Sequence, residues 1–103
     1  MDICLLGAGH IGRTIARLLH ESGDYRVKVL DRDERALEQL AAEGIRTVTL
    51  ETEDPAALAR ELVPGGAVVN ALPYHLAVTA ARAAGERGCH YFDLTEDVAA
   101  TRE

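Results

Sequence analysis

Three glycines near the start of the chain are spaced as in a G-x-G-x-x-G turn. Gly7, Gly9 and Gly12 lie in the stretch ICLLGAGHIGRTIARLL, between an apolar run and a helical pattern. In such a turn the first glycine permits the tight bend, the second lets the backbone approach a pyrophosphate, and the third lets the helix pack closely. The following helix start offers free N–H groups and a positive dipole end. The pattern predicts a dinucleotide-binding turn, and the alternative is a glycine turn needed only for packing.

An acidic residue follows at the distance that such a turn requires. Asp31 lies 19 residues after Gly12, at the end of the second apolar run. Its carboxylate could accept hydrogen bonds from the ribose hydroxyls of adenosine, which favours NAD(H), because a 2′-phosphate would meet a like charge. Arg32 comes next, and an arginine at this place can accommodate the 2′-phosphate of NADP(H). The prediction is therefore NAD or NADP, with NAD favoured, and the alternative for Asp31 is a turn or helix-cap role.

Apolar strand-like runs alternate with helical patterns along the whole chain. Strands are expected at residues 2–6, 25–31, 45–50, 67–72 and 89–94. Helices are expected at residues 10–21, 34–42, 55–63 and 73–86. This alternation predicts an α/β fold, a Rossmann-type doubly wound parallel sheet of five strands in the order 3-2-1-4-5 with right-handed crossovers.

Side-chain patterns predict how these helices begin and which way they face. Asp33 and Asp54 suit helix N-caps, and Pro55 suits the first helical position. Apolar residues of the first helix recur at helical spacing and are expected to face the core. They are Ile11, Ile15, Leu18 and Leu19.

Length and composition bound the class of protein. The 103 residues suit one domain, residues 1–103, and the formal net charge of −6 argues against nucleic acid or an anionic membrane as a partner. No apolar run is long enough to span a bilayer and the first residues lack a basic signal region, so the expected compartment is the cytoplasm. Cys4 and Cys89 fit no metal-ligand spacing and are expected to be buried, reduced thiols too far apart to bridge.

Two segments near the end of the chain are more specific than the glycine turn. Together with GAGHIG and VLDRDE, the segments VVNALPYH and HYFDLTEDV resemble the N-terminal NAD(P)-binding domain of the saccharopine dehydrogenase family over nearly the whole chain. The resemblance implies a nicotinamide cofactor and, in a longer parent enzyme, hydride transfer at a C–N bond of a small amino-acid-like substrate. The cofactor-lining residues that it implies are Gly7, Gly9, His10, Ile11, Gly12, Asp31, Arg32, Asn70, Ala71, Leu72 and Pro73.

Three further residues are candidates for the substrate side. His75 follows the fourth expected strand, close to where a nicotinamide would lie, although a solvated histidine is the simpler interpretation. By resemblance, Thr95 and Glu96 follow the fifth strand where related enzymes face the substrate amine, and a solvated acid is the alternative for Glu96. No complete catalytic set is recognisable, so the catalytic residues are not assigned and no metal is expected.

Members of this family are several hundred residues long, and a full dinucleotide fold has six strands. The chain is therefore expected to be an N-terminal portion that ends before the sixth strand and the substrate domain. Such a portion is expected to bind cofactor without turnover. Its fifth strand would form an exposed parallel edge with few charges, which suggests a homodimer through that edge.

Two other classes share the glycine turn. One is the nucleotide-sensing regulatory domain of potassium channels, which matches the first fifty residues but not NALPYH or YFDLTED. The other is a methyltransferase that uses S-adenosylmethionine, for which the strict three-glycine spacing and the missing seventh strand are unfavourable. Fold alone does not separate these functions.

Overall fold

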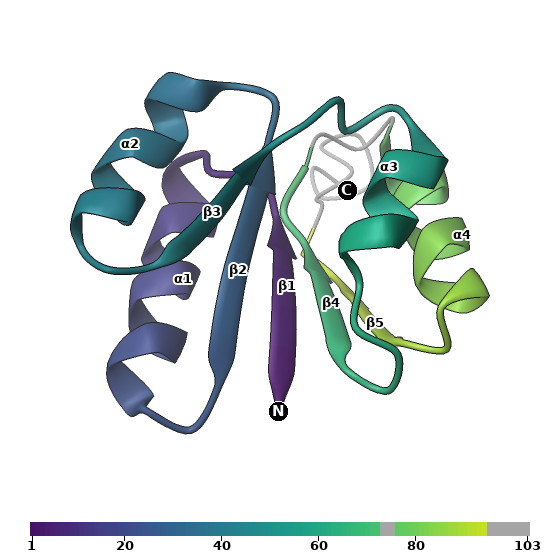
Figure 1. Cartoon of the computed structure of the whole chain (residues 1–103), viewed down its shortest axis with the longest axis horizontal. Coiled ribbons are helices and arrows are strands. Elements are labelled where there is room, and N and C mark those ends of the chain that lie inside the picture. The colour runs from purple at the N-terminus through teal and green to yellow at the C-terminus, as the bar shows by residue number, and fades with distance from the viewer. Residues whose placement is uncertain (73–75, 95–103) are drawn as a thin grey trace, which may run out of the picture.

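Five parallel strands form the centre of the structure, a computed structural model that describes residues 1–72 and 76–94 (Figure 1). The strand order is β3-β2-β1-β4-β5, which confirms the predicted Rossmann-type sheet. The strands are β1 (Asp2–Leu6), β2 (Arg26–Asp31), β3 (Arg46–Thr49), β4 (Ala67–Asn70) and β5 (His90–Asp93). They occupy the predicted runs, and four of them are one or two residues shorter than predicted at one or both ends.

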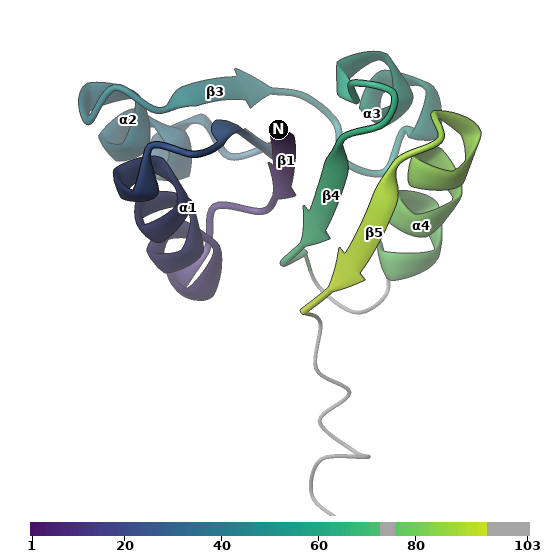
Figure 2. The same cartoon turned by 90° about the horizontal axis from the view of Figure 1, so that it is seen from below.

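Helices cover the sheet from both sides. Helices α1 (His10–Ser22) and α2 (Glu34–Ala42) lie against one face, over β1, β2 and β3. Helices α3 (Pro55–Glu61) and α4 (Ala77–Glu86) lie on the opposite face and pack against each other, with α4 over β4 and β5, as Figure 2 shows. The last helix was predicted to open at Pro73, which lies outside the described residues; the observed helix begins at Ala77.

The alternation of side chains along β1 builds two hydrophobic cores. Leu5 points to the core under α1 and α2, together with Val29 and Leu40. Cys4 and Leu6 point to the core under α3 and α4. Because β1 is buried on both faces, it carries a continuous apolar run, as central parallel strands do.

The predicted N-caps of two helices are confirmed. A carboxylate oxygen of Asp33 accepts the N–H groups of Arg35 and Ala36 at 3.0 and 3.4 Å. Asp54 caps α3 in the same way, with Pro55 at the first helical position. Each cap satisfies N–H groups that a helix start cannot satisfy by itself.

The predicted apolar face of α1 is only half correct. Ile15 and Leu19 pack against the core, but Ile11 is 59% exposed and Leu18 is 63% exposed. Gly12 is buried instead. Because glycine has no side chain, α1 comes close to the sheet at Gly12. The side chains of Ile11 and Leu18 then point to solvent rather than into the core.

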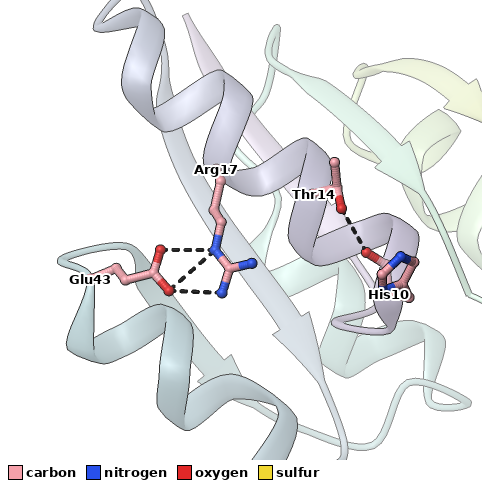
Figure 3. Close-up of polar contacts among 4 residues, drawn as sticks. All are labelled: His10, Thr14, Arg17 and Glu43. Carbon is pink, nitrogen blue, oxygen red and sulfur yellow. Dashed lines mark hydrogen bonds and ion pairs between the residues drawn. The ribbon is translucent and has the colours of Figure 1, made fainter.

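An ion pair joins the two helices of the first face. The guanidinium of Arg17 on α1 reaches the carboxylate of Glu43, the residue after α2, with an Nη2–Oε2 distance of 2.8 Å (Figure 3). This hydrogen bonding lowers the pKa of Glu43. The pair joins α1 to the C-terminal end of α2.

The two cysteines are both free thiols. Cys4 is buried, and burial raises the pKa of its thiol to about 12, so it stays protonated. Cys89 is only partly buried, contrary to the prediction, and its Sγ lies 3.2 Å from the carbonyl oxygen of Val63. Across the described part of the chain, no helix is long and apolar enough to cross a bilayer.

Candidate dinucleotide-binding site

The glycine turn joins the end of β1 to the start of α1, at the carboxyl edge of the sheet. The N–H of Gly7 donates to the carbonyl oxygen of Leu30 at 2.8 Å, which anchors the turn to β2. Gly7 has φ +101°, and a Cβ on it would lie 2.9 Å from the carbonyl oxygen of Ala71. Both its conformation and its surroundings therefore require glycine.

The other two glycines differ in what surrounds them. A Cβ on Gly12 would overlap the carbonyl oxygen of Gly7, so this glycine is required for packing α1 onto the turn. A Cβ on Gly9 would meet nothing within 4 Å, and Gly9 is exposed with ordinary extended backbone. Packing therefore explains Gly7 and Gly12 but not Gly9. The open space beside Gly9 is the place where a pyrophosphate would need close backbone approach.

The first turn of α1, which begins directly after Gly9, leaves N–H groups without partners inside the helix. The first helical hydrogen bond runs from the N–H of Arg13 to the carbonyl oxygen of Gly9 at 2.9 Å. The N–H groups of the three residues before Arg13 precede this ladder and have no partner within the helix. Gly9 supplies no side-chain cap, unlike the aspartates that cap α2 and α3, and no acidic residue lies in the first turn of α1. This helix start suits an anion.

His10 and Ile11 lie at this helix start, as predicted. Both side chains are exposed. The hydroxyl of Thr14 donates to the carbonyl oxygen of His10 at 3.0 Å, one turn further along α1 (Figure 3). The two side chains therefore lie at the solvent-exposed start of α1, outside the core.

Asp31 ties the end of β2 to the glycine turn. Its Oδ2 accepts the N–H of Ala8 at 2.7 Å, and its Oδ1 accepts the N–H of Asp33 at 2.9 Å. The carboxylate is partly buried, and Arg32 beside it is exposed. The sequence predicted the position of Asp31 but gave no signal of its bond to Ala8, which depends on how β1 and β2 pair. The residue predicted to bind the adenosine ribose is thus hydrogen-bonded to the turn predicted to bind the pyrophosphate.

The end of β4 forms the other border of the turn. Asn70 is fully buried, and its Oδ1 accepts the N–H of Leu72 at 3.0 Å. Its Nδ2 donates to the hydroxyl of Tyr91 at 3.0 Å. Leu72 is buried in the core under α3 and α4, so at this edge it is the backbone of Ala71 that borders Gly7. Tyr91 was not singled out from the sequence, because its role depends on the pairing of β4 with β5.

Four predicted site residues lie outside the described part of the chain. They are Pro73, His75, Thr95 and Glu96. Within residues 1–72 and 76–94, no group of three His, Cys, Asp or Glu side chains could hold a metal ion.

The parallel sheet, the glycine turn with an open Gly9 and the acid at the end of β2 define a Rossmann-type dinucleotide-binding domain. The particular family is shown by comparison with family models. Residues 3–103 match the model described as the saccharopine dehydrogenase NADP binding domain, and the chain belongs to this family. The resemblance drawn from the sequence is thereby confirmed.

Solved structures share this fold. Saccharopine dehydrogenase (L-Glu forming) from Saccharomyces cerevisiae matches with a TM-score of 0.83 and 22% identity over 98% of this chain and 23% of that one. An NADPH-dependent quinone oxidoreductase from Escherichia coli matches with a TM-score of 0.70 and 22% identity, over 84% of this chain and 32% of that one. The TrkA-N domain of an E. coli inner membrane protein matches with a TM-score of 0.66 and 16% identity, over 98% and 91%. The chain thus spans about a quarter of the length of the yeast enzyme.

Proposed function

We propose that this chain binds NADP(H) for an oxidoreductase that transfers hydride at a C–N bond of an amino-acid-like substrate. The observation that carries the proposal is the turn in which Gly7 and Gly12 are required by packing while Gly9 is left open before an uncapped helix start. Membership in the saccharopine dehydrogenase family supports the reaction class. The nicotinamide supplies the hydride chemistry. The protein's contribution is to hold the phosphates at α1 and the adenosine ribose beside Asp31.

Calorimetric titration of the chain with NADPH, NADH, ATP and S-adenosylmethionine tests this proposal. We expect selective binding of a nicotinamide dinucleotide and no turnover of amino-acid substrates by the isolated chain. Binding of ATP or S-adenosylmethionine alone would overturn it. Binding of ATP alone would favour a nucleotide-sensing module, for which the likeness to the TrkA-N domain is the supporting observation. Binding of S-adenosylmethionine alone would favour a methyltransferase.

The choice of NADP(H) departs from the preference for NAD(H) drawn from the sequence, which is not confirmed. The family description names NADP, and both oxygens of Asp31 accept backbone N–H groups, which offsets part of the charge that a 2′-phosphate would meet. Arg32 is exposed next to this carboxylate and is the proposed contact of the 2′-phosphate.

Arg32→Ala is expected to weaken NADPH binding about 10-fold, because it removes a charge-assisted hydrogen bond to the 2′-phosphate. NADH affinity should change less than about 2-fold, since NADH lacks this phosphate. Calorimetry of both cofactors measures the two effects. Arg82→Ala, which removes an exposed arginine from α4 on the other side of the sheet, is the matched control. Equal losses for NADPH and NADH would contradict the assignment.

We further propose that the chain forms a homodimer through the edge strand β5. β5 is an edge strand of the described sheet, and Phe92 on it is 56% exposed. No described helix covers the α1 side of β4 and β5 (Figure 2), where an apolar groove of about 580 Å³ includes Phe92, Leu94 and Val69. An exposed apolar edge of this kind favours pairing with a second copy.

Phe92→Ser is expected to make the chain monomeric at concentrations where the wild type is dimeric. Multi-angle light scattering across a dilution series measures this. Leu18→Ser is the control, because Leu18 is 63% exposed but does not line the groove. A wild type that stays monomeric at millimolar concentration would rule the dimer out.

A further inference from the structure

A buried amide connects the end of β4 to two neighbouring elements. Asn70 is the last residue of β4 and is fully buried. Its Nδ2 donates to the hydroxyl of Tyr91 on β5 at 3.0 Å, and that hydroxyl donates to the carbonyl oxygen of Ala77 at 3.3 Å. Ala77 is the first residue of α4. A single phenolic hydroxyl therefore joins the exit of β4 to the entry of α4.

The donor and acceptor roles in this connection are mutually consistent. A phenol has one proton to donate and lone pairs to accept, so it can accept from Asn70 and donate to Ala77 at the same time. Tyr91 is partly buried against the core under α3 and α4. Burial raises the pKa of Tyr91, the hydrogen bond from Asn70 lowers it, and the charge of Asp93 and a hydrogen bond with its side chain raise it, so that the net shift is upward and the hydroxyl keeps its proton.

The same asparagine sets the path of the chain along the glycine turn. Its Oδ1 accepts the N–H of Leu72 at 3.0 Å, which bends the chain as it leaves β4. The N–H of Ala71 donates to the carbonyl oxygen of Leu6 at 2.8 Å, directly before the turn. The carbonyl oxygen of Ala71 then lies so close to Gly7 that a Cβ there would approach it to 2.9 Å. Asn70 thus fixes residues 71–72 against the turn.

We propose that Tyr91, acting through Asn70, is a positioning residue for the nicotinamide half of the cofactor. The inference rests on the proposed function. In a doubly wound sheet the dinucleotide lies across the point where the strand order reverses, here between β1 and β4. Asp31 and Arg32, at the end of β2, take the adenosine half. The nicotinamide half then lies over the exit of β4, whose backbone Tyr91 and Asn70 hold in place.

Tyr91→Phe tests the inference, because it removes the hydroxyl and keeps the ring that packs in the core. Calorimetry compares NADPH with 2′-phospho-ADP-ribose, which has the same adenosine half and pyrophosphate but lacks the nicotinamide ring. We expect NADPH affinity to fall about 3- to 10-fold and the affinity of 2′-phospho-ADP-ribose to change less than about 2-fold. The fluorescence of bound NADPH should change as well, since it reports on the surroundings of the reduced ring.

Tyr25→Phe is the matched control, because Tyr25 is 38% exposed and directly precedes β2, at the amino end of the parallel strands, whereas the exit of β4 lies at their carboxyl end. A merely structural role for Tyr91 would lower the melting temperature and weaken both ligands equally, and that result would overturn the inference. Unchanged binding of both ligands would overturn it too. If the wild type binds neither ligand, the proposed function fails first. If the wild type binds NADH alone, NADH and ADP-ribose replace the two probes.

Discussion

Gly12→Ala should destabilise the chain more than any other single methyl group added to the glycine turn. A Cβ at this position overlaps the carbonyl oxygen of Gly7, which is backbone and is itself held by β2 and by the exit of β4. The helix would have to move away from the sheet, and such overpacking costs about 3 kcal/mol or more of unfolding free energy. For a domain of this size that is a large part of the total and corresponds to a melting temperature lower by at least about 12 °C.

Gly85→Ala is the matched control for this prediction. Gly85 also lies within a helix, but a Cβ there would meet nothing within 4 Å. Alanine favours helix more than glycine does, so this variant should gain up to about 1 kcal/mol. Thermal unfolding followed by circular dichroism measures both variants. A Gly12→Ala melting curve that coincides with that of the wild type would show that α1 is free to shift, contrary to the packing described.

Gly9→Ala should have the opposite effect, because it should leave the fold intact and strongly weaken cofactor binding. Gly9 has extended backbone, and its Cβ would meet no protein atom, so the cost is that of a poorer N-cap, about 0.5 to 1 kcal/mol. The added methyl group would occupy the space that the pyrophosphate needs. We expect NADPH affinity to fall at least about 30-fold, which corresponds to about 2 kcal/mol of binding free energy.

Calorimetry gives the affinity of Gly9→Ala, and its melting curve without ligand shows whether the fold is intact. Gly85→Ala serves again as the control, since its methyl group lies on α4 and should leave the affinity unchanged. If Gly9→Ala bound NADPH as well as the wild type, the phosphates could not lie against this turn, and the proposed site would be wrong. The two glycine variants together separate the packing role of the motif from its binding role.

The order of the elements was predictable because each signal was local. Alternating strands and helices imply a parallel sheet, and Asp33 and Asp54 mark helix starts by chemistry that acts within three residues. The inward face of α1 was predicted less well. Helical periodicity ranks residues by side-chain hydrophobicity and so points to Ile11 and Leu18, whereas the contact is decided by Gly12, which has no side chain.

The candidate site was predictable in position but not in its internal bonding. The glycine spacing and Asp31 identified the turn and the acid beside it. The bond from Ala8 to Asp31, and the connection from Asn70 to Tyr91, join residues that are 23 and 21 positions apart. Such pairs form only when strands align in register, and nothing in a local pattern encodes that register. Asn70 was predicted to pass beside the cofactor; its side chain is buried, and its Oδ1 accepts the N–H of Leu72.

The hydrogen bond between Asp31 and the N–H of Ala8 has a consequence for protein engineering. The acid at the end of the second strand is the residue that meets the 2′ position of the adenosine ribose, so it is an obvious position for changing coenzyme preference. In this chain the same carboxylate accepts the N–H of Ala8 in the glycine turn, the proposed phosphate site, so neutralising it would loosen that turn whatever coenzyme was intended. Redesign would therefore do better to keep Asp31 and vary Arg32, whose side chain is exposed. A substitution of Asp31 would therefore change both the coenzyme preference and the glycine turn, whereas a substitution of Arg32 would change the coenzyme preference and leave the bond to Ala8 in place.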